Sequence, residues 1–301
     1  MTYIIDNAHI LKGETVQNSS ILMENGMISS VRPSFKLYKH MRMDADSFLM
    51  TPTHILFDPS LPLKASKSEK KNYFLNQFLL KGCTVIFTSV TIRYEQELKP
   101  ELKRLHSEMA DSPLDYVVGV RIPVQLLTPS LIRACKKEKI PVIMLEITDF
   151  SELRDRPWGW IKEAMFPYNS PLAPVFCSEA TGRSDEAAAD WVKLMTSMKI
   201  PHLRSELCEG DPLKMEVLKK TGIFPFKSNL YNGGEISYNF YSRSPEVENV
   251  EISQLFHYHN DRLLITVHKG IVVRAGSQVF YHEGAGENVK IKTPAFFQAS
   301  Y

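Results

Sequence analysis

Alternating apolar and polar positions dominate the first fifty residues and predict β-strands. The expected strands cover Tyr3–Leu11, Ser20–Glu24 and Met27–Val31. Asn25 and Gly26 separate the last two strands, and this dipeptide is typical of a two-residue hairpin turn because both residues tolerate positive φ angles. The chain is therefore expected to open as a small antiparallel sheet.

From residue 52 the pattern changes to short apolar runs that alternate with helical stretches. Ser66 and Glu69 have the spacing of a capping box, which predicts a helix from Lys67 to Lys81. Thr128 and Pro129 suit the first positions of another helix, because a hydroxyl caps free amides and proline fits the first turn. Such alternation is typical of parallel βα units. The helix that Thr128 and Pro129 open is expected to run to Lys139. The other elements expected here are a helix at about 95–110 and strands at 53–57, 84–90, 116–122 and 141–147.

The remainder of the chain returns to a β pattern after a segment with little periodicity. The section after Ile147, which is rich in tryptophan and proline from Arg156 to Pro174, is predicted to be a loop with one short helix. After Gly222 the runs are short, bounded by turns and rich in β-branched and aromatic residues. The expected elements are a strand at Ala173–Ser178, helices from Ser184 to about Met198 and from Asp211 to Lys220, and strands at Glu235–Tyr241, Glu251–Tyr258, Leu263–His268, Ile271–Arg274 and Gln278–His282.

This order of elements predicts a discontinuous domain. Each β end of the chain is too small to bury the face of a sheet by itself, so pairing the two ends is the economical solution. We expect residues 1–51 and 222–301 to form one composite β-sandwich, with residues 52–221 inserted as an α/β domain.

Composition and charge narrow the class of protein. Of the 301 residues, 44% are hydrophobic and 23% are charged, which is ordinary for a globular chain. The formal net charge of +2 gives no support for binding nucleic acid. We find no apolar run long enough to span a membrane and no secretory leader, so we expect a cytoplasmic protein without membrane insertion. The cysteines are widely spaced, which favours buried free thiols over a metal or redox motif; they are Cys83, Cys135, Cys177 and Cys208.

Several segments in the predicted order resemble the amidohydrolase superfamily, in the cyclic-amide branch that contains dihydroorotase, dihydropyrimidinase and allantoinase. In that family a composite β-sandwich brackets a metal-bearing βα barrel. The resemblance implies the same layout here, with a shortened or incomplete TIM-like barrel, because the insert has only 170 residues and a full barrel runs to about 250. The similar segments are 3–28 with its Asn-Gly turn, Met50-Thr51-Pro52 leading to Asp58-Pro59, Lys81–Ile86, Thr221–Lys227 followed by Leu230 and Gly233, and Val267–Val273.

The sequence departs from this family at its metal-ligand positions. The first barrel strand of the family ends in His-x-His, two imidazoles that hold a divalent metal. Aligning Asp58 with the family's Asp places Ser60 and Pro62 at those two positions. The family's fourth strand supplies a carbamylated lysine, and the matching run 141–147 has Glu146 as its only ionisable residue. We therefore expect no metal and no other cofactor.

Glu146 has several possible roles. Its carboxylate could replace the metal bridge, cap the following segment, or pair with Arg154 or Arg156. After residue 147 the insert contains one histidine, His202, and no recognisable counterpart of the family's later ligand motif.

Other residues with possible chemistry have a simpler structural explanation. His54 precedes Asp58, where a satisfied strand histidine is commoner than a ligand. His257 and His259 would share a face of the predicted strand, but no third ligand is near in sequence. The remaining candidates are Cys177-Ser178-Glu179 at a strand end, a turn at Gly284–Glu287, the aromatic group Trp158, Trp160, Phe166 and Tyr168, and the basic group Lys64, Lys67, Lys70 and Lys71 beside the capping box.

Two functional hypotheses follow. The favoured one is a catalytically inactive, dihydroorotase-like pseudoenzyme that acts as a binding or scaffold partner, as a homo-oligomer or with another protein. The alternative is a diverged hydrolase of cyclic amide C–N bonds that uses strand-end carboxylates and one divalent metal. Its candidate catalytic residues are Asp58, Glu146 and Glu179, although three carboxylates without histidine make a poor zinc site.

Overall fold

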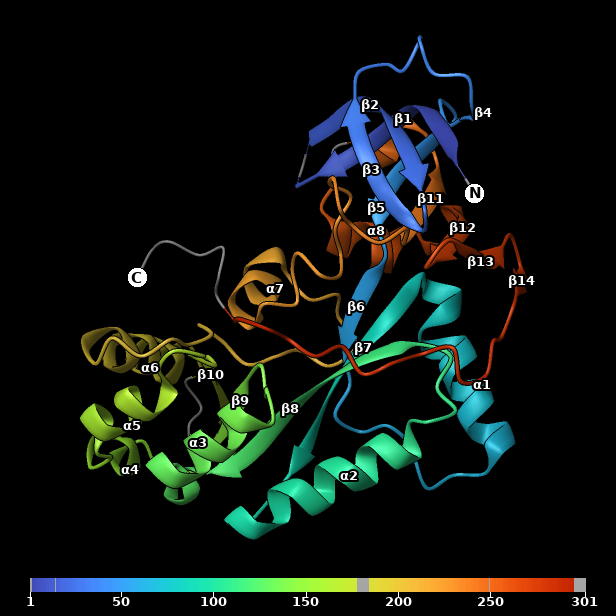
Figure 1. Cartoon of the computed structure of the whole chain (residues 1–301). Helices are drawn as coiled ribbons and strands as arrows, with labels where there is room; N and C mark the ends of the chain where they lie inside the picture. The colour runs from blue at the N-terminus through green and yellow to red at the C-terminus, as the bar shows by residue number, and fades with distance from the viewer. Residues whose placement is uncertain (1, 14, 178–183, 249, 295–301) are drawn as a thin grey trace. The chain divides into compact units, whose positions relative to one another are not determined.

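The computed structural model describes residues 2–13, 15–177, 184–248 and 250–294 (Figure 1). The chain divides into two compact units, each built from separate stretches of sequence. Unit 1 contains Met1–Leu56, Pro62–Ile86 and Pro225–Ala285. Unit 2 contains Phe57–Leu61, Phe87–Phe224 and Gly286–Tyr301.

Unit 1 is built on a nine-stranded sheet that combines strands from both ends of the chain. The order is β14-β13-β12-β11-β5-β1-β2-β3, and β4 also pairs with β1. Strand β5 joins the two sets, because it pairs in parallel with β1 and antiparallel with β11. The bounds are β1 Tyr3–Lys12, β2 Thr15–Glu24, β3 Met27–Arg32, β4 Met41–Asp44, β5 Phe48–Pro52, β11 Tyr238–Ser242, β12 Leu263–His268, β13 Ile271–Ala275 and β14 Gln278–Val279.

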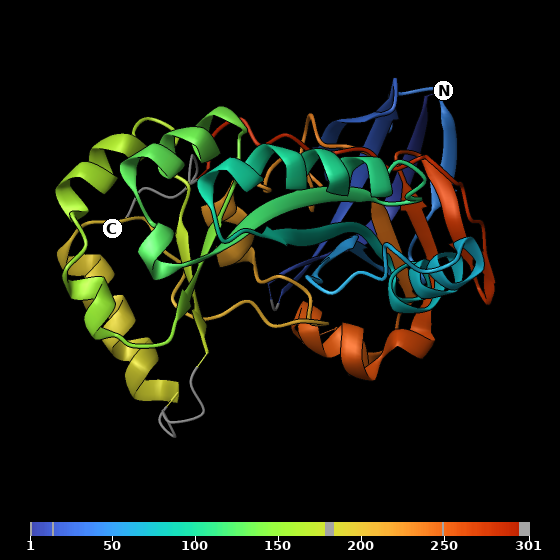
Figure 2. The same cartoon turned by 90° about the horizontal axis from the view of Figure 1, so that it is seen from below.

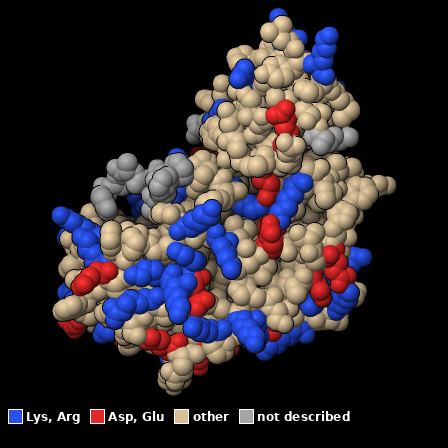
Figure 3. Space-filling model, viewed as in Figure 1, with Lys and Arg blue, Asp and Glu red and all other residues tan. Residues whose placement is uncertain are grey.

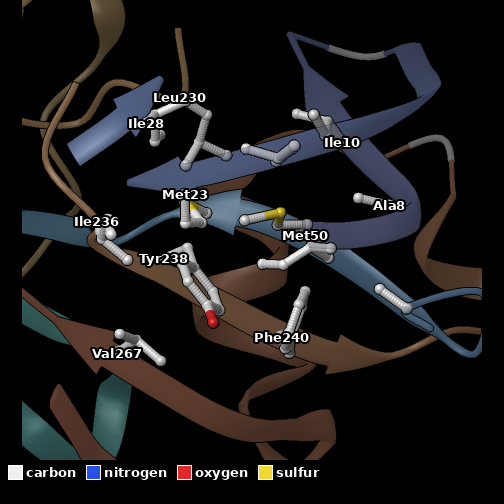
Figure 4. Close-up of a cluster of buried hydrophobic side chains, with 13 residues drawn as sticks. Ala8, Ile10, Met23, Ile28, Met50, Leu230, Ile236, Tyr238, Phe240 and Val267 are labelled. Atoms are coloured by element: carbon white, nitrogen blue, oxygen red, sulfur yellow. The ribbon is translucent and has the colours of Figure 1, made fainter. Parts of the chain in front are cut away.

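The core of unit 1 also draws on both ends of the chain. Figure 4 shows Met23 and Met50 from the N-terminal strands packed with Tyr238, Phe240 and Val267 from the C-terminal strands. All five side chains are buried. Neither set of strands would exclude water from this face alone, so the apolar positions of both ends stabilise the sheet together.

Local signals in the sequence account for several boundaries in unit 1. Asn25 and Gly26 both have positive φ, 53° and 79°, as the hairpin between β2 and β3 requires. The capping box of Ser66 and Glu69 opens α1, Lys67–Gln77, at the predicted residue, but the helix ends four residues before the predicted Lys81. Further along lie the helices α8, Ile252–Tyr258, and the 3-10 helices η1 Leu79–Lys81, η4 Pro245–Val247 and η5 Asn260–Arg262.

The prediction of a strand at Glu251–Tyr258 is wrong. The segment forms α8, and the side chains of Glu251 and Gln254 cap its free amides. Leu255 and Phe256 are the buried residues of this helix. A short apolar run fits a strand and a helix equally well by periodicity alone, and here the capping pair decides the outcome.

Unit 2 contains most of a curled five-stranded sheet with helices around its outside, as Figure 2 shows for α2, α3, α5 and α6. The sheet order is β10-β9-β8-β7-β6, and β8, β9 and β10 run parallel. This is a mixed α/β arrangement, as the alternating pattern predicted. It is consistent with the partial TIM-like barrel that the resemblance implied. The strands are β6 His54–Phe57, β7 Cys83–Thr91, β8 Asp115–Pro123, β9 Ile143–Ile147 and β10 Leu172–Phe176. The helices are η2 Glu95–Glu97, α2 Leu98–Glu108, η3 Val124–Leu126, α3 Pro129–Lys137, α4 Ser151–Arg154, α5 Trp158–Met165, α6 Ser184–Ser197 and α7 Met215–Thr221.

An irregular segment connects the two edges of this sheet. His202 forms a parallel bridge with Leu172 at the edge strand β10, and Glu209 forms one with Phe57 at the opposite edge strand β6. Trp191 on α6 is fully buried, and its indole N–H donates to the carbonyl of Leu203 at 2.8 Å. Residues 200–210 therefore satisfy backbone groups at both edges, which an open sheet would leave exposed.

The section between Ile147 and β10 contains two short helices, α4 and α5, where one was expected. Its aromatic side chains do not form a single cluster. Trp158 and Tyr168 are buried and donate hydrogen bonds to backbone carbonyls, whereas Trp160 and Phe166 are about two thirds exposed. The predicted start of the last helix of the insert, at Asp211, is four residues too early, since α7 begins at Met215.

Candidate functional site at the ends of the parallel strands

Polar side chains gather where the parallel strands of unit 2 end. Arg93 follows β7, Arg121 lies near the end of β8, Glu146 lies in β9, and Cys177 directly follows β10. Loops at the carboxyl ends of such strands are where βα proteins usually bind ligands, because the same edge collects side chains from several strands.

The register of the strands places two of these side chains on one face of the sheet. Arg121 lies opposite Met144, and Glu146 lies opposite Pro123 and Val175. Since residues two apart on a strand share a face, Arg121 and Glu146 project from the same side.

Close packing fills the same face below this point. A Cβ atom added to Gly119 would lie 2.8 Å from side-chain atoms of both Met144 and Val142. The ring of Phe87 would also be within 3.3 Å of it, and this ring contacts Phe57 edge-on at 5.6 Å between centroids. The absence of a side chain at residue 119 thus allows an apolar layer beneath the polar groups.

Glu146 is held by two guanidinium groups. Arg93 donates from both terminal nitrogens, with Nη2 3.3 Å from Oε1 and Nη1 bound to Oε2. Arg121 donates from Nε to Oε1 at 2.8 Å. The Glu146 side chain is only 11% exposed, while those of Arg93 and Arg121 are 55% and 33% exposed. We call Arg93, Arg121 and Glu146 the strand-end triad.

The triad fixes the charge of its carboxylate. Burial by itself would raise the pKa of Glu146, but the hydrogen bond from Arg93 and the charges of both arginines outweigh it, so the pKa lies below its usual range. The hydrogen bond with Glu146 likewise raises the pKa of Arg93. Glu97 adds a second negative charge near Arg93 and accepts hydrogen bonds from the backbone N–H groups of Arg93 and Tyr94.

The sequence suggested different partners for Glu146. Arg154 and Arg156 are closer in the chain, yet Glu146 pairs with Arg121 and Arg93, which lie 25 and 53 residues away. Arg156 instead donates from Nε to the backbone carbonyl of Glu152. Arg121 lies near the end of β8, which pairs in parallel with β9, and Arg93 follows β7, the next strand of the sheet; this strand-end position is the signal that could have identified them.

Asp58, another predicted catalytic carboxylate, lies in a local turn. Asp58 is buried at the end of β6, where its N–H donates to the carbonyl of Phe87 and its Oδ1 accepts from the N–H of Ser60 at 2.8 Å. This is the local turn that aspartate commonly forms with its own backbone. Glu179 and Ser178 lie outside the described residues. The assignment of Asp58, Glu146 and Glu179 as catalytic residues stays a prediction.

The cysteines divide into two pairs. Cys83 and Cys135 are buried as expected, and burial raises the pKa of Cys135 to about 12. Cys177 and Cys208 are exposed, so the prediction of buried thiols is wrong for these two. The Sγ atom of Cys177 lies 4.0 Å from Nη2 of Arg121, at the rim of the triad.

The histidines that the sequence singled out have contacts or positions that explain them without a metal. His54 is buried, its Nε2 lies 2.6 Å from the hydroxyl oxygen of Tyr241, and its ring packs edge-on against Phe256. His257 and His259 were expected on a strand but lie at the carboxyl end of α8, so the shared face that would bring their rings together does not exist. His202 lies beside the edge strand β10, and its Nδ1–H donates to the carbonyl oxygen of Ile200 at 2.8 Å.

Comparison with known proteins identifies the architecture. A dihydropyrimidinase from Brevibacillus agri NCHU1002 aligns over 98% of this chain and 100% of its own, with a TM-score of 0.61 and 13% sequence identity. A D-hydantoinase aligns over 97% and 99% with a TM-score of 0.58 and 13% identity. The D-hydantoinase (dihydropyrimidinase) from Thermus sp. aligns over 98% and 100%, with a TM-score of 0.58 and 12% identity.

The chain has the fold of the D-hydantoinases and dihydropyrimidinases. No protein-family model and no curated protein matches the sequence. Within the described residues, no helix is both long and apolar enough to cross a membrane.

Among the described strand-end residues of this hydantoinase-like fold, Arg93, Arg121 and Glu146 do not form a donor set for a divalent metal. Ser60 and Pro62 stand where the resemblance places two imidazole ligands, and a proline side chain has no lone pair to donate. Glu146, the one ionisable residue of β9, is already bound by two cations. A metal ion beside Arg93 and Arg121 would meet two like charges, so these residues do not fit a metal centre of the family type.

Proposed function

We propose that this protein is a catalytically inactive relative of the cyclic amidohydrolases that acts by binding a partner or small ligand. The observation that carries the proposal is the strand-end triad. Arg93 and Arg121 donate hydrogen bonds to the carboxylate of Glu146, which would otherwise be the most plausible metal ligand or acid–base group at the strand ends.

Physical chemistry supports an inert Glu146. A carboxylate whose pKa is lowered by two guanidinium groups is a weak general base at neutral pH, because it holds a proton poorly. Breaking the triad to bind a metal would leave Arg93 and Arg121 without their shared partner, and uncompensated partly buried charges are costly. The triad therefore replaces a reactive centre with a stabilising one.

The metal content of the untagged protein tests this proposal. We expect protein from zinc- and manganese-supplemented cells to hold far less than one equivalent of metal by mass spectrometry, with carbonic anhydrase, which has a three-histidine zinc site, as the positive control. With either metal added, we expect no hydrolysis of hydantoin or dihydrouracil above the uncatalysed rate. One equivalent of metal that is lost in the Asp58→Ala/Glu146→Ala variant, together with turnover, would instead support the hydrolase alternative.

The Glu146→Gln variant tests the structural role of the triad separately. We expect it to lower the free energy of unfolding by about 1–2 kcal/mol, since it removes charge-assisted hydrogen bonds from a side chain that is mostly buried. Urea denaturation measures this change, and Glu163→Gln on the exposed surface of α5 gives a matched control. An unchanged stability would show that the triad does not stabilise the fold.

A further inference from the structure

The loop between β3 and β4 presents an apolar side chain to solvent at its tip. Leu37 is 95% exposed, the highest exposure among the large hydrophobic residues described. Tyr38 and Met41 beside it are 38% and 61% exposed. We call residues 33–41 the tip loop; in Figure 1 it is the pale-blue loop that leads to β4.

Side-chain packing and a backbone hydrogen bond hold the tip loop in its conformation. Phe35 is buried against Ile4 and Leu22, which anchors the loop to the sheet. The ring of Tyr38 packs edge-on against Phe35 at 5.2 Å, and the Tyr38 N–H donates to the carbonyl of Phe35 at 3.0 Å. The exposed position of Leu37 is therefore set by its neighbours on both sides.

Arg42 binds backbone carbonyl groups of the tip loop. Its Nη2 donates to the carbonyl oxygens of Phe35 at 2.6 Å and Tyr38 at 3.0 Å, and its Nη1 pairs with Asp6 at 2.6 Å. These carbonyls already have a donor, so less hydrogen bonding to water is lost when the tip enters an apolar or interfacial environment.

The charges within the sequence of the tip loop are all basic, although Arg42 at its base pairs with Asp6 of β1. No acidic residue occurs between Glu24 and Asp44, whereas this stretch contains the four basic residues Arg32, Lys36, Lys39 and Arg42. Lys36 and Lys39 flank Leu37 and are exposed. In Figure 3 the end of unit 1 that carries the loop shows basic and uncharged surface without red.

We propose that the tip loop binds an anionic lipid surface. Leu37 enters the boundary between headgroups and acyl chains, and Lys36 and Lys39 contact lipid phosphates. Tyr38 suits this depth, because its ring is apolar and its hydroxyl is polar. A projecting apolar tip between two cations suits a soft, uniformly charged surface and requires no matching pocket, which favours lipid over an acidic protein partner. The loop would lie on the membrane surface and would not span it.

Vesicle sedimentation of the full chain tests this inference. We expect binding to vesicles of phosphatidylcholine with 30% phosphatidylserine, weaker binding as salt is raised, and no binding to phosphatidylcholine alone. The variants Lys36→Gln/Lys39→Gln and Leu37→Ser should each lower the partition coefficient roughly tenfold, from the loss of two surface charges or one buried leucine.

Two matched variants distinguish the loop from general surface properties. Lys103→Gln/Lys137→Gln removes the same charge from exposed positions on other elements, and Ile271→Ser removes an apolar side chain that is 55% exposed. Both should bind like the wild type, with circular dichroism confirming that all variants fold. The inference is overturned if anionic vesicles do not bind at low salt, or if the tip-loop and control variants lose binding equally. Binding to polyglutamate but not to vesicles would overturn it in favour of an acidic protein partner.

Discussion

His54 shows how one buried side chain makes stability depend on pH. The ring is fully buried beside Tyr241 and Phe256, and desolvation lowers its pKa from 6.5 to about 4. The folded state therefore binds a proton less readily than the unfolded state. Its contribution to stability is fully present above pH 6.5 and is lost as the pH falls from 6.5 towards 4, by roughly 3 kcal/mol at the lower end.

Urea denaturation between pH 4 and pH 7.5 measures this effect. The difference in slope between the wild type and His54→Gln isolates His54 from His106 and His202, whose pKa values are also lowered by burial. We expect the variant to lose stability less steeply with falling pH. Identical slopes in the two proteins would contradict the assignment.

At the scale of elements, two glycines should respond to alanine in opposite directions. The N–H of Gly286 donates to Ser112, and a Cβ there would lie 1.9 Å from the carbonyl oxygen of Leu114. We expect Gly286→Ala to destabilise the protein by about 2–4 kcal/mol, because backbone must move to admit it. Gly159 on α5 has open space around its Cβ position, so Gly159→Ala should stabilise by up to about 1 kcal/mol. Thermal or urea unfolding of both variants checks the pair, and equal effects would disprove the packing argument.

At the scale of the whole molecule, the sheet of unit 1 depends on chain segments that are almost two hundred residues apart. Strand β5 pairs with β11 from Tyr241 opposite Leu49 to Tyr238 opposite Pro52. A chain that ends at residue 224 lacks β11–β14 and should leave the apolar face of β5 exposed. We expect this truncation to bind the dye ANS and to lack a cooperative unfolding transition. A chain ending at residue 294 should unfold cooperatively and bind little ANS, like the full chain. Native-like cooperative unfolding of the shorter chain would show that the N-terminal strands fold without their partners.

Prediction from sequence succeeded where the decisive residues are neighbours in the chain. The turn at Asn25, the capping box at Ser66 and the N-cap at Thr128 all have the geometry expected from their local spacing. It failed at 251–258, where the apolar pattern allowed two interpretations, and at Glu146, whose partners come from other strands. The exposure of Cys177 also depends on surroundings that the sequence does not specify.

The sequence by itself determined the order of elements, their local turns and caps, and the replacement of the expected imidazoles by Ser60 and Pro62. These features depend on residue chemistry and on contacts a few positions apart. Only the tertiary structure decided that Arg93 and Arg121 converge on Glu146 and that Leu37 is held out in solvent by Phe35. Both outcomes require strands distant in sequence to lie in register, and no local pattern encodes that proximity.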